Sequence, residues 1–258
     1  MRAKKLLGQN FLMHARIAER IALTARLSPD SVVLEIGPGT GMLTRELLKL
    51  CKKVIAIETD YELYEKLQIV FVDEIRDGKL ELIHGDIRNY PLDTAIAGSR
   101  GYKVVANIPY YLTGEIFRMF LESENQPSSM TLLVQKEVAD RIVARDGKES
   151  ILSLSVKVYG TPKREFLVPR GAFKPAPNVD SAVLTISDIS RKNFATKTEE
   201  KKFFELIHAG FAHKRKFVRK NLLEVGLPNG DIPEKARAED LSLTQWLEVI
   251  AEKNQPSV

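Results

Sequence analysis

The sequence predicts an α/β fold, with a mostly parallel sheet covered by helices and followed by a small all-helical domain. Short apolar runs alternate along the chain with amphipathic helical stretches, a pattern typical of parallel sheets covered on both faces. Three of these runs end in a polar residue that can bind a ligand. After the polar stretch 187–198 only helical periods appear, so we expect domains at 1–187 and 188–258.

The predicted elements follow from the hydrophobic period of each stretch. Residues 17–27 carry apolar side chains at helical spacing, and Ser28-Pro29-Asp30 ends this helix. Residues 32–36 form a short, nearly all-apolar strand, which a glycine turn at 37–41 connects to a helix at 42–50. Further strands are expected at 54–57, 80–83, 104–106 and 131–134, with helices at 61–71, 115–121 and 137–144.

The last strands and the C-terminal helices complete this prediction. Two apolar runs, at 152–159 and 179–186, have no obvious helix between them and are expected to pair antiparallel at the edge of the sheet. They bring the expected number of strands to about seven. In the C-terminal domain, helices are expected at 199–212, 214–225 and 243–252, with a short turn near 233–237.

Composition excludes several classes of protein. The chain has 258 residues, of which 44% are hydrophobic and 28% charged, as in ordinary globular proteins. No apolar run approaches the roughly 18 residues of a membrane span, so we expect no contact with a membrane. The single cysteine, Cys51, excludes an internal disulfide framework and leaves a zinc cluster without enough thiolates. We therefore expect no metal site and a reducing, cytoplasmic location.

The charge distribution favours a polyanion as partner. The net charge is +5, and the first 27 residues carry six basic residues against Glu19 alone. Such a segment also fits an organelle transit peptide, although Gly8-Gln9-Asn10-Phe11-Leu12 looks functional and would be lost on cleavage.

Acidic residues end two neighbouring strands of the predicted sheet. Open α/β sheets bind ligands at the carboxyl ends of their strands. A carboxylate at Glu58 can accept hydrogen bonds from both hydroxyls of a ribose, and Asp86 can accept one from an adenine amino group. Either acid alone also fits a helix N-cap. Together they indicate a cofactor that contains adenosine.

The glycine turn distinguishes between adenosine cofactors. Glu35-x-Gly37-x-Gly39-x-Gly41 follows a strand and opens a helix, so a nucleotide-like ligand can approach its backbone amides closely. A dinucleotide fingerprint has Gly or Ala at the sixth position, where this chain has Met42. The turn instead resembles that of proteins that bind S-adenosylmethionine. A tight turn required only by sterics remains the alternative.

Asn107-Ile108-Pro109-Tyr110 follows the fourth strand and suits a planar base that carries an amino group. A residue before proline stays extended, so the Asn107 side-chain oxygen and the Ile108 carbonyl can face the same way as two acceptors, beside the flat ring of Tyr110. A base that presents a carbonyl there would leave buried groups unpaired, at a cost of roughly 1–3 kcal/mol each. The tetrapeptide resembles the signature of methyltransferases that act on amino nitrogens, although a plain strand-to-turn segment could look the same.

Five motifs taken in order resemble one family along most of the chain. They are GQNFL at 8–12, LEIGPGTG at 34–41, NIPYY at 107–111, QKEVA at 135–139 and FKPAPNVDS at 173–181. In this order the chain resembles the ribosomal RNA adenine dimethylases, most closely the bacterial small-subunit enzymes that dimethylate two adjacent adenosines. The resemblance extends from about Lys5 to Trp246. One departure is Leu112-Thr113-Gly114, where relatives often carry Ile and hydroxyl residues, which leaves the helix cap open.

The resemblance implies a Rossmann-like, seven-stranded class I methyltransferase sheet that uses S-adenosylmethionine. The cofactor would be held by Asn10, Leu12, Gly37, Gly39, Gly41, Glu58, Asp86 and Asn107. Asn107 and Pro109 would receive the target N6 amine, and the base would stack on Tyr110 and on Phe173, at roughly 1–3 kcal/mol per stacked base. Catalysis would then consist mostly of orientation, without a nucleophile from any of the four histidines. The expected reaction is N6,N6-dimethylation of two adjacent adenosines in a loop near the 3′ end of 16S rRNA, within a 30S assembly particle, by a monomer.

A basic segment in the C-terminal domain is expected to contact RNA phosphates. Residues 206–223 include no acid, and five basic residues lie within seven positions, namely Lys214, Arg215, Lys216, Arg219 and Lys220. On a helix these would face solvent while Phe217, Leu222 and Leu223 pack inward. A solvated basic face is the alternative. Because an adenine in a perfect duplex cannot reach a pocket at strand ends, the target must be single-stranded or flipped out.

Two other functions remain open. Large-subunit RNA methylases of the macrolide-resistance type share the sheet and the Asn107 corner, but Leu241-Ser242-Leu243, Trp246 and the loop at 173–181 favour the small-subunit branch. A non-catalytic nucleic-acid-binding relative is the second alternative. The intact glycine turn, together with Asn107 and Tyr110, argues against it.

Overall fold

A computed structural model describes residues 9–91, 96, 99, 101–227 and 229–251. The chain divides into two compact units, one of residues up to 139 together with 163–189, and one of residues 140–162 together with those from 190 onward. The expected boundary after residue 187 stays a prediction. Residues 140–162 join the second unit because α8 (Ile151–Lys157) packs against α9 (Lys197–Gly210) and because the carbonyl oxygen of Tyr159 accepts a hydrogen bond from Ser190 N at 2.9 Å.

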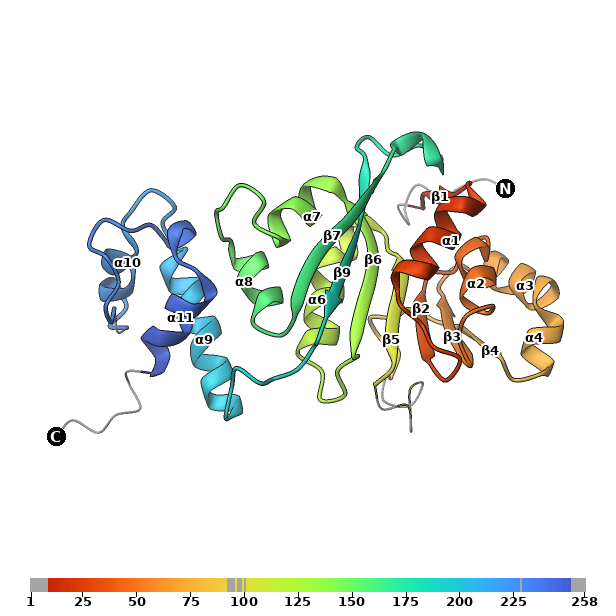
Figure 1. The fold of residues 1–258 in the computed structure, drawn as a ribbon, viewed down its shortest axis with the longest axis horizontal. Helices are drawn as coiled ribbons and strands as arrows, with labels where there is room; N and C mark the ends of the chain where they lie inside the picture. The colour runs from red at the N-terminus through yellow and green to blue at the C-terminus, as the bar shows by residue number, and fades with distance from the viewer. Residues whose placement is uncertain (1–8, 92–95, 97–98, 100, 228, 252–258) are drawn as a thin grey trace. The chain divides into compact units, whose positions relative to one another are not determined.

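A seven-stranded sheet forms the centre of the first unit, as the sequence predicts (Figure 1). Its strand order is β4-β3-β2-β5-β6-β9-β7, in which the first five strands are parallel and β9 runs antiparallel to β6. The strands are β2 (Val32–Ile36), β3 (Lys53–Glu58), β4 (Leu80–His84), β5 (Lys103–Asn107), β6 (Ser129–Gln135), β7 (Thr161–Val168) and β9 (Ser181–Ser187).

The register of the central strands positions the site. Ile36 pairs with Ile57 on one side and with Ala106 on the other. The next residues along these three strands are Gly37, Glu58 and Asn107, which therefore meet at the same edge of the sheet. This is the carboxyl edge, where open α/β sheets bind their ligands.

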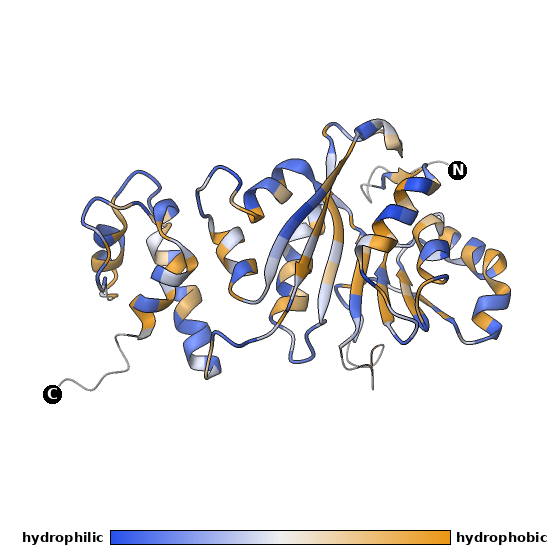
Figure 2. Ribbon diagram, viewed as in Figure 1, coloured by the Kyte–Doolittle hydropathy of each residue, from blue (hydrophilic) through white to orange (hydrophobic). Residues whose placement is uncertain are grey.

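Helices bury both faces of the sheet, because apolar residues occupy both faces of the central strands (Figure 2). On one face, a continuous core joins residues such as Val33, Val54 and Val105 to the apolar sides of α1, α2 and α3. The other strand positions, such as Leu34 and Ile55, are equally buried. The helices of this unit are α1 (Ala15–Thr24), α2 (Met42–Leu47), α3 (Tyr61–Val70), α4 (Val72–Arg76) and α6 (Thr113–Leu121), with α7 (Lys136–Ile142) at its border.

One predicted strand is a helix. Residues 152–159 alternate apolar and polar side chains, but they form α8, which starts with a capping box between Ser150 and Ser153. The Ser153 amide donates to Ser150 Oγ at 3.1 Å and the Ser150 amide to Ser153 Oγ at 2.7 Å. The alternation misleads because Ser153 is fully buried despite its polarity. The strand that sequence reasoning missed, β7, is largely polar and lies at the edge of the sheet.

A short second sheet joins the two ends of the first unit. Strand β1 (Phe11–Leu12) pairs antiparallel with β8 (Phe173–Lys174), with Leu12 opposite Phe173. Neither strand was predicted, because two residues carry no period. The pair attaches the segment 9–13 to the loop that carries the last of the five motifs.

The second unit is helical in its C-terminal part, as predicted. Helices α9, α10 (Val218–Glu224) and α11 (Leu243–Ala251) surround the fully buried Trp246, whose ring stacks on Phe211 with centroids 6.0 Å apart. The helix expected at 214–225 starts only at residue 218. Within the described residues, no helix has both the length and the apolar character needed to cross a membrane.

The late start of α10 changes the picture of the basic segment. The Asn221 side chain is buried and donates to the carbonyl oxygens of Gly210 at 2.6 Å and His213 at 3.3 Å, which closes a turn before the helix. Lys214, Arg215 and Lys216 therefore lie in that turn and are exposed, while Arg219 and Lys220 belong to α10. Leu223, expected to pack inward, is 62% exposed; Val218, Asn221 and Leu222 form the buried face instead.

Candidate functional site

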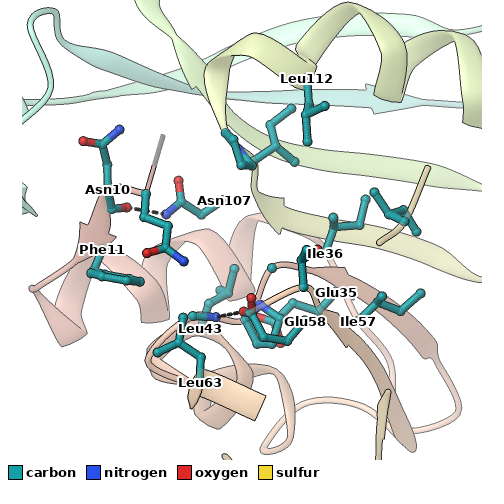
Figure 3. Close-up of a pocket in the computed structure, with 18 of the residues that line it drawn as sticks. Asn10, Phe11, Glu35, Ile36, Leu43, Ile57, Glu58, Leu63, Asn107 and Leu112 are labelled. Atoms are coloured by element: carbon teal, nitrogen blue, oxygen red, sulfur yellow. Dashed lines mark hydrogen bonds between the residues drawn. The ribbon is translucent and has the colours of Figure 1, made fainter. Parts of the chain in front are cut away.

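A pocket opens at the carboxyl edge of the sheet in the first unit (Figure 3). The residues that line it come from the stretch before and within β1, the glycine turn with the start of α2, the ends of β2, β3 and β4, and the corner after β5, together with Leu63 of α3. Of the predicted site residues, the structure brings together Asn10, Leu12, Gly37, Gly39, Glu58, Asp86, Asn107, Pro109 and Tyr110 around this pocket. Their individual roles stay predictions.

The glycine turn has its open side at Gly37. This residue has φ of 63°, and its amide donates to the Ile57 carbonyl at 2.9 Å, which ties the turn to β3. A Cβ built at Gly37 would meet no atom within 4 Å, so free space lies directly against the backbone. A ligand can therefore approach the main chain here as closely as the sequence predicts.

Gly41 serves a different purpose. It does not line the pocket, and with φ of 77° it precedes the first residue of α2. A Cβ at this position would lie 2.5 Å from the ring of Phe71 and 2.8 Å from Leu67. A glycine is thus required at position 41 because α2 packs closely against the end of α3. A sequence pattern cannot distinguish a glycine required for packing from one required for ligand contact.

Glu58 connects the end of β3 to the glycine turn. Its Oε2 accepts a hydrogen bond from the Gly39 amide and its Oε1 accepts one from the Asp60 amide, both at 2.9 Å. Burial raises the pKa of this carboxyl above its ordinary value, although the two amides oppose the rise. The side chain is only 5% exposed and lines the pocket, so its orientation is fixed before any ligand arrives.

Glu35 is a buried acid that sequence reasoning noted only as part of the turn. It is 1% exposed, lies beside Glu58 in Figure 3 and also lines the pocket. Burial raises the pKa of its carboxyl to about 8. The Thr44 hydroxyl lies near enough to oppose this rise, yet within the described chain neither Glu35 Oε2 nor Thr44 Oγ1 has a hydrogen-bond partner. The signal in the sequence was an acid inside an otherwise apolar strand, since a buried unpaired carboxyl is costly.

Asp86 is already paired. The Arg88 guanidinium donates hydrogen bonds to its carboxylate, from Nε to Oδ1 at 3.0 Å and from Nη2 to Oδ2 at 2.5 Å. The Arg88 backbone amide also donates to Oδ1, at 3.0 Å. This guanidinium lowers the pKa of Asp86 below its ordinary value. Arg88 Nε also lies 3.1 Å from Asp86 Oδ2, so the bonds from Arg88 already take up the roughly four acceptor positions of this carboxylate, and a further donor has to share an oxygen with Arg88. Sequence reasoning missed Arg88, although it also lines the pocket.

Asn107 lies at the end of β5, as the sequence predicts. Ile108 is buried, and Pro109 has φ of −57° and ψ of 133°. The Asn107 Nδ2 donates to the Asn10 carbonyl at 3.1 Å, as the dashed line in Figure 3 marks. Among the described residues none donates to Asn107 Oδ1, so this oxygen is the acceptor that the site offers. The Thr113 hydroxyl donates to the Tyr110 carbonyl at 2.9 Å, and α6, which begins at Thr113, has no side-chain cap among the residues that the structure describes.

The segment 9–13, which contains β1, is attached by hydrogen bonds beyond the pairing of β1 with β8. Besides the Asn10 carbonyl, the Gln9 Nε2 donates to Asp60 Oδ2 at 3.3 Å, and the Met13 amide donates to the Ala172 carbonyl at 2.9 Å. Gln9 and Phe11 both line the pocket, which sequence reasoning did not foresee residue by residue. The segment is therefore one wall of the site.

The remaining predicted residues lie elsewhere. Phe173 is 4% exposed and packs in the core with Leu12 and Ala172 rather than lining the pocket, so its stacking role stays a prediction. The five basic residues belong to the second unit. The described residues bring together no group of three or more His, Cys, Asp and Glu that could hold a metal ion.

Comparisons with known proteins identify relatives of the whole chain. The family model described as ribosomal RNA adenine dimethylase matches residues 1–255. A ribosomal RNA small subunit methyltransferase A of Dehalococcoides mccartyi is 39% identical over 262 residues, covering 98% of this chain and 89% of the relative. The protein of the same name from Fusobacterium nucleatum is 36% identical and covers 96% of each chain.

Solved structures agree with these relatives in fold. The 23S rRNA methyltransferase ErmE superimposes with a TM-score of 0.79 at 25% identity, covering 95% of this chain and all of that one. A dimethyladenosine transferase from Plasmodium falciparum gives a TM-score of 0.78 at 24% identity, covering 95% and 97%. The sheet is therefore the Rossmann-like sheet of rRNA methyltransferases, as the sequence predicts. The family match along nearly the whole length shows that the chain belongs to the ribosomal RNA adenine dimethylases.

Proposed function

We propose that this protein is an S-adenosylmethionine-dependent enzyme that dimethylates the N6 amino groups of two adjacent adenosines in small-subunit rRNA. The observation that carries the proposal is the Asn107 corner, where the bond from Nδ2 to the Asn10 carbonyl leaves Oδ1 as an acceptor at the pocket that the glycine turn also lines. The names of relatives at 36% to 39% identity support the small-subunit substrate.

The residues around the pocket fit the cofactor. Glu58 would accept the ribose hydroxyls, and Asp86 would accept the adenine amine on an oxygen that it shares with Arg88. The open space against Gly37 would accommodate the methionine part of the cofactor. The Glu35 carboxyl, whose Oε2 has no partner among the described residues, suits the ammonium group of that part. Asn10 and Leu12 would close the pocket from the segment 9–13. Gly39 would contribute its backbone, while Gly41 would act through packing. When bound, S-adenosylmethionine supplies an activated methyl group.

The corner after β5 would orient the target base. Asn107 Oδ1 and the Ile108 carbonyl would accept the two protons of the N6 amine, and Tyr110 would stack on the base, with Phe173 as a second stacking residue after it leaves its core position. Pro109 keeps the corner extended. Guanine would present a carbonyl to these acceptors and leave them unpaired, at a cost of roughly 1–3 kcal/mol each. Because the amine can lose its proton after attack, orientation provides most of the catalysis.

The substrate would be a 30S assembly particle, with the target in a single-stranded loop near the 3′ end of 16S rRNA. We further propose that the enzyme acts as a monomer in the cytoplasm, during small-subunit biogenesis. Lys214, Arg215, Arg219 and Lys220 would contact RNA phosphates. Lys216 would contribute less, because its Nζ already pairs with Glu224 at 2.7 Å.

The test uses labelled S-adenosylmethionine with small-subunit particles that lack the modification. Two adjacent dimethyladenosines near the 3′ end of 16S rRNA are the expected products, mapped by mass spectrometry of nuclease fragments. Label found only in large-subunit RNA would instead assign the macrolide-resistance type of activity. Calorimetry that shows no cofactor binding would indicate a non-catalytic relative.

A further inference from the structure

The Tyr110 hydroxyl is held by a residue that the proposed function does not use. Its Oη lies 2.7 Å from the Oγ of Ser181, with either atom as the donor. Ser181 is fully buried, and it is the first residue of β9, opposite Gln135 in the antiparallel ladder with β6. The Ser181 hydroxyl is held in place by the sheet, whereas the Tyr110 hydroxyl belongs to an aromatic ring that lines the pocket.

Ser181 itself cannot shift easily. The carbonyl of the preceding residue, Asp180, accepts a hydrogen bond from the Lys136 amide at 3.0 Å, which continues the ladder beyond Gln135. The Asp180 carboxylate accepts another from the Arg170 amide at 2.9 Å. Ser181 is therefore anchored on both sides of its own backbone, by strand pairing and by the loop that precedes it.

The other end of the Tyr110 side chain is anchored as well. Pro109 restricts the backbone before it, and the Tyr110 carbonyl accepts the hydroxyl of Thr113, which is only 4% exposed. With the backbone fixed at one end and the hydroxyl at the other, the long axis of the ring and its position at the pocket are determined. A base that stacks on a ring held in this position has its amino edge set relative to Asn107, three residues earlier.

We propose that Ser181 is a positioning residue, which through its hydrogen bond to the Tyr110 hydroxyl fixes the position of the ring on which the target adenine stacks. The inference rests on the proposed function and extends it to a residue outside the pocket lining. It has a specific consequence for a reaction with two transfers to one nitrogen. A base held less firmly leaves the site more often between the first and the second methyl transfer, so monomethyladenosine accumulates.

The experiment is a double-mutant cycle in the full-length protein, with Ser181→Ala, Tyr110→Phe and the double variant. Unmethylated small-subunit particles are varied at saturating S-adenosylmethionine, and kcat, KM and the ratio of monomethyl to dimethyl product are measured. The matched control is Ser187→Ala at the exposed end of the same strand, where Oγ donates to the neighbouring Asp188. Urea unfolding and cofactor calorimetry accompany each variant, and the double variant leaves no unpaired hydroxyl that could impair folding.

Each single variant is expected to lower kcat by about 10-fold and to raise the monomethyl share, with cofactor affinity unchanged. The double variant should be no slower than the slower single variant, because both changes remove the same hydrogen bond. Losses that multiply, or a Ser181→Ala enzyme that behaves like the Ser187→Ala control, would overturn the inference while leaving the proposed function intact. A wild-type protein that does not methylate small-subunit particles would overturn the proposed function and this inference with it.

Discussion

Replacing Glu35 with glutamine is expected to make the protein without cofactor more stable, and increasingly so as the pH rises. Burial raises the pKa of Glu35 from its ordinary 4.5 to about 8. Below pH 4.5 the carboxyl is protonated in both the folded and the unfolded chain. Between pH 4.5 and about 8 the unfolded chain releases this proton while the folded chain keeps it, so the free energy of unfolding falls as the pH rises.

The size of the effect follows from the same two values. Each pKa unit corresponds to about 1.4 kcal/mol, so between about pH 5 and pH 8 the wild-type protein should lose at most about 4 kcal/mol that Glu35→Gln retains. The glutamine side chain introduced at this position adds a cost for its own buried amide, but that cost does not change with pH.

Urea unfolding of both proteins at these two pH values measures the difference, with the exposed Glu115→Gln as the control. S-adenosylmethionine should reduce the pH dependence of the wild-type protein, because its ammonium group would favour the ionised carboxyl. A stability difference between the variant and the wild-type protein that is the same at both pH values would refute the reasoning.

Three further predictions concern single contacts of the site. Gly41→Ala should lower the free energy of unfolding by about 3 kcal/mol or more in urea titrations, because its methyl group collides with the core; Gly147→Ala, at the same φ of 77° but in open space, should lose only about 1 kcal/mol, and equal losses would contradict the packing role. Arg88→Met should return the pKa of Asp86 towards its ordinary 3.8, so that cofactor affinity measured by calorimetry falls more than in the wild type as the pH drops towards about 4. If the affinities of the variant and the wild type decline equally with pH, Arg88 has no role in cofactor binding through Asp86. Asn107→Ala should reduce kcat on small-subunit particles by about 100-fold at saturating cofactor, and an unimpaired rate would show that the amine is held elsewhere.

Much of the site could be predicted because parallel strands align their ends. Glu58, Asp86 and Asn107 each follow an apolar run, and alternation with helices determines that such runs lie side by side in one sheet. The register then brings the strand ends together without any further information. The roles expected for Asn10 and Leu12 came instead from resemblance, since β1, which Asn10 precedes and Leu12 ends, pairs with β8, more than a hundred residues away in the sequence.

What could not be predicted depends on tertiary contacts of polar residues. Ser153 reads as the outward residue of a strand, yet it caps a helix and is buried. The burial of Glu35, the direction of the Arg88 side chain towards Asp86 and the bond between Tyr110 and Ser181 all depend on side-chain positions that no hydrophobic period determines. Asn221 likewise delays the start of α10, because a buried amide closes the turn that the period alone would make helical.

The attachment of Asn10 to Asn107 has a consequence for the order in which the protein is made. The two residues are 97 positions apart, and β1 completes its pairing only with Phe173 and Lys174. Strand β9, which follows these residues, is inserted between β6 and β7. A ribosome must therefore synthesise the first unit at least as far as Lys174 before the segment 9–13 can complete its pairing, and a chain released before residue 173 would have the glycine turn but would lack β8, the partner strand of β1.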